Sequence, residues 1–187
     1  LWNSYFEQLA PLQQKGLLAL SKSQEVEVDY QRYAEAKPED IIGSMYDLGE
    51  LSIDEIALLS VFAVLPAESI AYPTIEILLP DTENLEDNLS NLAQKGWLAY
   101  NKINDAFKCS PVIQNTTKTK NHNLFRDCQP LLATLKKKLD YEFDGLGTLK
   151  NSTYEEAIRY VRYAESVVNN FEQADDSLCS VCERLGK

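Results

Sequence analysis

One segment constrains the fold of this chain more than any other: a strongly apolar stretch that runs from Ile56 to Leu65. Ser52 and Glu55 precede it with the spacing of a capping box, in which each side chain binds a backbone amide that a helix start leaves unpaired. Pro66 follows and cannot continue a helix. Because apolar residues surround most of its circumference, we expect this helix to lie at the centre of a core.

Two further short helices are predicted after Pro66. The first begins at Tyr72, just before a proline that suits the first turn of a helix, and it ends before Pro80. The second begins near Asn84 and carries leucines on one face at intervals of three and four residues. We expect it to end at Gly96, because glycine readily adopts the left-handed backbone that closes many helices.

Residues 97–100 and 106–109 are the only convincing β-strand signal in the sequence. They flank a short polar turn in which Asn104 and Asp105 tolerate a positive φ, so we expect a β-hairpin. Three short helices followed by a hairpin make a winged helix. We expect Trp97 to be the aromatic residue that holds the hairpin against the third helix.

The remainder of the chain is predicted to be helical. Pro111 begins one helix, and apolar residues at intervals of three, four and seven continue the helical pattern through residues 124–139. Residues 140–152 contain two glycines, an asparagine and a serine, which favours a loop. A second capping box begins a helix at Thr153, and a last helix covers about residues 175–185. Two such antiparallel helices look like one unit of a helical solenoid.

These patterns predict a mainly α fold in three parts. Residues 1–50 form a helical segment, and residues 51–119 form the winged helix with its small β-hairpin. Residues 120–187 form antiparallel helices that resemble the start of a helical repeat.

The charge balance bears on what such a winged helix can bind. The chain has 29 acidic and 18 basic residues and a net charge of −11, which repels phosphate backbones. A DNA-binding winged helix places its third helix in the major groove, and residues 84–95 contain two acids and one lysine. We therefore expect a protein or peptide partner rather than nucleic acid. The alternative is a DNA-binding transcription regulator that uses the following basic residues: Lys118, Lys120, Arg126, Lys136, Lys137 and Lys138.

No motif in the sequence predicts catalysis, a bound cofactor or a metal site. A phosphate-binding loop is a glycine-rich stretch that ends in Lys-Ser or Lys-Thr, and none occurs. His122, the single histidine, has no catalytic partner that the sequence identifies, and we expect it on the surface. Cys179 and Cys182 have the spacing of half a zinc site without a second pair, so we interpret them as half-buried helical thiols. We expect this chain not to be an enzyme.

Several features favour a cytoplasmic location without a membrane partner. The apolar runs are far shorter than the roughly 20 residues of a membrane-spanning helix. No targeting peptide is recognisable at the start of the chain, and four scattered cysteines fit a reducing compartment. Because the sequence begins at Leu1 without a methionine, we expect a fragment of a larger protein.

Several stretches resemble the region that follows the nucleotide-binding domain in bacterial signal-transduction ATPases of the STAND or NB-ARC type. In that family the region includes a winged helix and often precedes tetratricopeptide repeats. The more specific features are the Lys-Gly-Trp-Leu entry to the hairpin and the Pro-Val-Ile-Gln start of the next helix. The similar stretches are residues 48–52, 58–66, 92–98, 110–114 and 160–165.

The resemblance implies a regulatory role. In such proteins the winged helix binds an ATPase module of the same chain and helps to hold a closed ADP state, so ATP or ADP is implied in the parent protein and none in this fragment. An ATPase module before residue 1 and a repeat array after residue 187, which senses a protein or peptide, are also implied. The family often has a histidine near the nucleotide phosphate at the position of Ser110, directly before Pro111. The serine hydroxyl can donate only a neutral hydrogen bond there.

Overall fold

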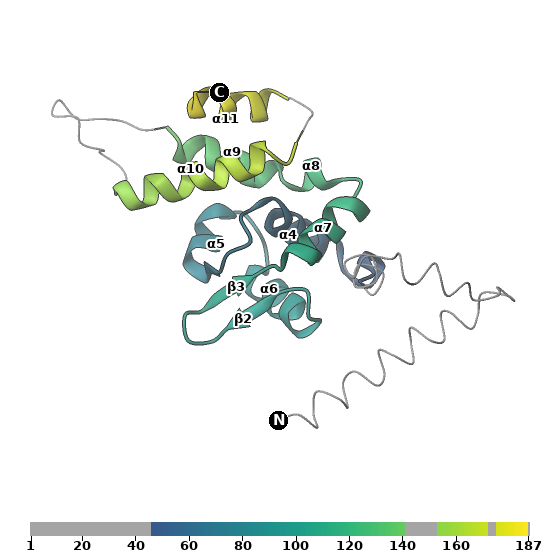
Figure 1. Cartoon of the computed structure of the whole chain (residues 1–187). Helices are drawn as coiled ribbons and strands as arrows, with labels where there is room; N and C mark the ends of the chain where they lie inside the picture. Colours follow the sequence, from purple (N-terminus) through teal and green to yellow (C-terminus); the bar gives the residue numbers. More distant parts are fainter. Residues whose placement is uncertain (1–45, 141–152, 172–174, 187) are drawn as a thin grey trace, which may run out of the picture. The chain divides into compact units, whose positions relative to one another are not determined.

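The computed structural model describes residues 46–140, 153–171 and 175–186. Residues 47–187 belong to one compact unit. The helical segment predicted for residues 1–50 and the loop predicted for residues 140–152 lie almost wholly outside the described residues. Within those residues the fold is mainly helical with a small antiparallel sheet (Figure 1), which confirms the predicted fold class.

Helix α4 (Ile53–Val64) is the central helix that the sequence predicts. Its capping box is formed, because the Ser52 amide donates to the Glu55 carboxylate over 2.7 Å and the Glu55 amide donates to the Ser52 hydroxyl over 3.2 Å. A single 3-10 turn, η1 (Leu48–Glu50), precedes it, and the helix ends before Pro66 as predicted. Helix α4 lies inside the core, because seven consecutive residues, which cover every side of the helix, are buried. These residues are Leu58, Leu59, Ser60, Val61, Phe62, Ala63 and Val64.

Two shorter helices follow, α5 (Tyr72–Leu78) and α6 (Leu85–Gln94), where the sequence predicts them. The backbone enters α6 through Asn84 with a φ of 51° and leaves it through Gly96 with a φ of 80°. A Cβ at Gly96 would meet no neighbouring atom, so the positive φ alone favours glycine there. The apolar face of α6 is buried as expected and consists of Leu85, Leu89 and Leu92.

The sheet has three short strands, β1 (Ile70–Ala71), β2 (Ala99–Asn101) and β3 (Ala106–Lys108). Their order is β1-β3-β2, and both pairings are antiparallel, with Phe107 of β3 opposite Ile70 and Tyr100. Strand β1 was not predicted, because two residues between helices are too short for a periodic signal. It ties the segment between α4 and α5 to the hairpin.

The hairpin begins later than the sequence predicts. Trp97 and Leu98 were expected in its first strand, but their amides donate to the carbonyl of Leu92 over 2.9 and 3.3 Å. These bonds close the end of α6, so the ladder with β3 starts only at Ala99. In the turn, Asp105 has the expected positive φ of 43°.

Three helices follow the hairpin: α7 (Pro111–Lys120), α8 (Leu124–Asp127) and α9 (Gln129–Lys138). Helices α7 and α8 pack against α4, while α9 packs against α5 and α8 (Figure 1). The chain leaves helical geometry between α7 and α8 at Asn121, whose buried side-chain amide donates to the Ser60 hydroxyl over 2.7 Å. The inner face of α9 is fully buried through Leu131, Leu132 and Leu135.

The carboxyl end of α4 is closed by side chains from distant helices. Residue 66 is proline and has no amide hydrogen, so the Phe62 carbonyl lacks its helical donor. The buried side-chain amide of Gln114, on α7, donates to the carbonyls of Phe62 and Leu65 over 2.8 and 2.9 Å. The glutamine of the Pro-Val-Ile-Gln stretch is therefore a helix-closing residue.

Helix α10 (Tyr154–Val168) completes the closure of α4 and begins at the predicted second capping box. The Thr153 amide donates to the Glu156 carboxylate over 2.9 Å, and the Glu156 amide donates back to the threonine hydroxyl. Farther along, the Ser166 hydroxyl donates to the Val64 carbonyl over 2.8 Å. Helix α10 is thereby joined to the central helix of the winged helix.

The last described helix, α11 (Asp176–Leu185), packs against both α9 and α10. The sequence predicts an antiparallel pair of α10 and α11. In the structure α9 packs against both of these helices. Leu178 and Val181 of α11 are buried, as is the leucine face of α9.

Candidate protein-interaction surface

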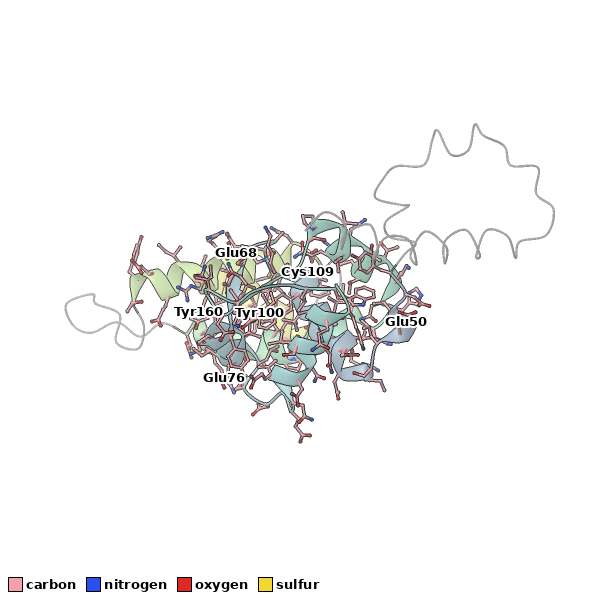
Figure 2. The ribbon with its side chains drawn as sticks, turned by 90° about the horizontal axis from the view of Figure 1, so that it is seen from below. Glu50, Glu68, Glu76, Tyr100, Cys109 and Tyr160 are labelled. Carbon is pink, nitrogen blue, oxygen red and sulfur yellow. The ribbon has the colours of Figure 1, made fainter. Side chains whose placement is uncertain are left out.

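A groove runs between helix α6 and the β2–β3 hairpin. It has a volume of about 590 Å³ and is bounded by the first residue of α5, one face of α6 and the inner residues of the hairpin. Among the coloured elements of Figure 1, α6 and the hairpin lie lowest, so they face the viewer in Figure 2, which labels Tyr100 of the hairpin and Glu76 of α5. The lining residues are Tyr72, Glu86, Ser90, Ala93, Gln94, Tyr100, Asp105 and Phe107.

Tyr100 forms the hairpin wall of this groove and is held in place although 49% of it is exposed. Its hydroxyl donates to the Asp105 carboxylate over 3.1 Å, and its ring lies 4.8 Å from the Phe107 ring between centroids. The hydrogen bond to Asp105 stabilises the protonated phenol, so it raises the pKa of Tyr100. The groove thus has a fixed aromatic wall.

Tyr72 lies at the end of the groove where α5 begins. Its amide donates to the carbonyl of Asp105 over 2.8 Å, which joins the start of α5 to the hairpin. Burial raises the pKa of Tyr72, and the negative charges of Glu76, Glu86 and Asp105 raise it further. The carboxylates of three separate elements therefore act on one end of the groove.

The single basic residue near the end of α6 is engaged elsewhere. The Lys95 ammonium donates to both carboxylate oxygens of Glu55 over 2.8 Å. Burial disfavours the charged form of Glu55, but the hydrogen bonds from Lys95 and Ser52 outweigh burial and hold its pKa below the usual value. Glu55 is only 3% exposed, so this pair joins the end of α6 to the start of α4 and compensates the charge of the lysine.

An apolar side chain stands at the tip of the hairpin beside the groove. Ile103 is 92% exposed, and its amide donates to the Asn101 side chain over 2.9 Å. This local bond, together with the left-handed backbone at Asp105, shapes the turn. Ile103 is therefore an apolar side chain that solvent surrounds at the tip of the hairpin.

The residues that the sequence singles out lie outside the groove lining. Trp97 is only 4% exposed, as its predicted packing role requires, and Gly96 precedes it at the end of α6. Pro111 occupies the first turn of α7. The hydroxyl of Ser110 accepts from the Ile113 amide over 3.3 Å and caps α7, while a nucleotide contact through it stays a prediction.

The sequence did not single out the residues that form the groove. The acidic composition of α6 pointed toward Glu86, whereas Tyr100 was expected only as a strand residue and Asp105 only as a turn residue. Their juxtaposition with Tyr72 depends on the β1–β3 pairing, which has no recognisable sequence signal.

The cysteines fall into two classes. Cys109 and Cys128 are buried, and burial raises the pKa of each thiol to about 12. Cys182 is half-buried as interpreted from sequence, but Cys179 is exposed, because the inner face of α11 is supplied by Leu178 and Val181 instead. The His122 side chain is exposed.

Within residues 46–140, 153–171 and 175–186, no cluster of three or more histidine, cysteine or acidic side chains is arranged to hold a metal ion. None of the helices in the described ranges combines the length and the apolar character needed to cross a membrane.

Comparisons with known proteins give no family. Neither a family model, nor a curated protein, nor a solved structure matches this chain. The resemblance to the STAND and NB-ARC ATPases therefore stays a prediction.

Proposed function

We propose that this chain is a non-catalytic, regulatory protein-interaction region of a larger cytoplasmic signalling protein, and that its winged helix docks on another protein surface through the α6–hairpin face. In the arrangement that the family resemblance implies, this surface belongs to a nucleotide-binding ATPase module, and the helices after residue 153 connect the winged helix to a repeat sensor. The chain itself binds no nucleotide in this proposal.

The observation that carries the proposal is the chemistry of α6. Glu86 and Asp87 are exposed in its first turn, and Lys95 at its end is paired with the buried Glu55. A helix that enters a DNA groove needs positive charge toward the phosphates, which supply nearly all of the free energy of non-specific binding and a large share of that of specific binding. Tyr100 of the hairpin and Tyr72 at the start of α5 line the same groove, and tyrosine is enriched in protein–protein interfaces.

The link between α10 and α4 supports a role in transmitting a signal. Ser166 and Asn170 both donate to the Val64 carbonyl, and Arg162 pairs with Glu68 over 2.9 Å. A displacement of α10 by a downstream sensor would therefore act directly on the central helix of the winged helix.

Photo-crosslinking in the full-length protein, in its own host, tests this function. A photoreactive amino acid at Ile103 is expected to crosslink to a discrete segment of a protein, either an ATPase module of the same chain or a separate partner. Tyr154, which is 74% exposed at the start of α10, is the matched position away from the groove. Crosslinks from position 103 to nucleic acid, or a gel shift of random duplex DNA at low salt, would favour the transcription-regulator alternative instead.

A further inference from the structure

We propose that the α6–hairpin groove binds a cationic segment of a partner protein, with an arginine or lysine side chain placed between the Tyr100 ring and the carboxylates of Glu86 and Asp105. This inference rests on the proposed docking function and adds the chemistry of the partner.

The charge of the surrounding surface is the first argument. From Tyr72 to Lys108 the chain carries six carboxylates and three lysines. One of these lysines, Lys95, is bound to Glu55, so its charge is already compensated. Two of the carboxylates, Glu86 and Asp105, line the groove itself, and its lining includes no lysine. Positive charge on the partner complements this surface and steers its approach.

The aromatic wall is the second argument. A guanidinium or ammonium group within about 6 Å of a tyrosine ring centroid is attracted to the face of the ring. Tyr100 is half exposed, and its orientation is fixed by Asp105 and by Phe107 behind it. A ring and a carboxylate held together in this way offer both a stacking face and a hydrogen-bond acceptor to one arginine.

The neighbouring apolar residue defines the edge of the interface. Ile103 is almost completely exposed at the hairpin tip, next to the groove wall. An occupant that fills the groove would cover this side chain with its own apolar residues, which removes the exposed isoleucine from water. Lys102 lies beside it in the turn and would fall at the rim, where a charge contributes little.

The occupant is a different protein rather than a second copy of this chain. The chain has a net charge of −11, so two copies repel each other at any distance within the screening length. Nucleic acid is repelled for the same reason. A basic segment of a partner is the macromolecular surface that satisfies the charge, the aromatic wall and the apolar edge together.

Glutamates at equivalent positions of two helices allow a matched test. Glu86 lies in the first turn of α6 and Glu155 in the first turn of α10, and both are exposed. Each stabilises its helix through the dipole, so Glu86→Gln and Glu155→Gln remove the same charge at a similar cost in stability. Only the first change lies in the groove.

Fluorescence anisotropy measures binding of three short labelled peptides to the whole chain: alternating arginine and alanine, alternating serine and alanine, and alternating glutamate and alanine. The arginine peptide is expected to bind tightest. Glu86→Gln and Asp105→Asn each weaken its binding about threefold, and their combination weakens it about tenfold. Tyr100→Ala weakens it about threefold, whereas Tyr100→Phe retains most of the ring contribution. Thermal unfolding of each variant checks that the fold is intact.

Two results would overturn the inference. Equal weakening by Glu86→Gln and Glu155→Gln would mean that the arginine peptide follows net charge alone, and equal binding of the arginine and serine peptides would mean that cations are not selected. Either result leaves the docking function standing if position 103 still crosslinks to a protein. If a photoreactive residue at position 103 crosslinks to no protein in a chain without any other substitution, the docking function itself is refuted.

Discussion

The substitution Gln114→Met tests the two hydrogen bonds that the Gln114 side chain donates, while it nearly preserves the volume of that side chain. Methionine has nearly the same length and shape, so the change leaves little cavity beneath α7. It removes the side-chain donor that reaches the carbonyls of Phe62 and Leu65. The first of these carbonyls cannot recover a helical partner, because Pro66 stands where the donor amide would be.

The magnitude follows from the burial of the two acceptors. A buried carbonyl that loses its donor costs about 1–3 kcal/mol. Gln114 is 8% exposed, so water can reach the site to a small extent and reduce the cost of each lost bond. We therefore expect the free energy of unfolding to fall by about 2–4 kcal/mol, a large part of the stability of a domain of this size.

Urea unfolding followed by circular dichroism measures this loss. The expected result is a lower midpoint with an unchanged slope, since the change alters stability and not the surface exposed on unfolding. Asn115→Met, at the next and exposed position of α7, is the control and should change stability by less than about 0.5 kcal/mol. Equal midpoints for the two variants would refute the argument that Gln114 closes α4.

Three further predictions concern stability and thiol chemistry. Trp97→Ala removes a buried indole and should lower the free energy of unfolding by about 3–5 kcal/mol in a denaturant titration; an unchanged curve would contradict the packing of the hairpin on α6. Because the folded-state pKa of Glu55 is lowered, its pair with Lys95 stabilises the fold fully above the ordinary glutamate pKa of about 4.3, and this contribution is lost as the pH falls through the lowered value. Unfolding midpoints of Glu55→Gln and the unmodified chain should therefore converge in acid, and a constant difference at every pH would refute the assignment. The two buried thiols, Cys109 and Cys128, should react with an aromatic disulfide reagent only on unfolding, whereas the two thiols of α11 react in the folded chain; four equally fast thiols would show that the core is open.

Much of the helical structure could be read from the sequence, because the signals that begin and end helices act over a few residues. The capping boxes at Ser52 and Thr153 satisfy amides within their own first turns. Pro66 ends α4 because of its own ring, and Gly96 takes the left-handed backbone because it lacks a side chain. Each of these effects is complete within the segment, and each was predicted correctly.

The groove and the closure of α4 could not be read in this way, because they depend on contacts across long sequence separations. Lys95 meets Glu55 across 40 residues, and Gln114 meets Phe62 across 52. Strand β1 pairs with β3 across a stretch of chain that contains α5, α6 and β2. The sequence by itself determined where helices begin and end and that the third helix is acidic. Only the tertiary structure decided which carboxylates and tyrosines share one groove. The reason is that local backbone preferences do not specify which distant residues the folded core brings together.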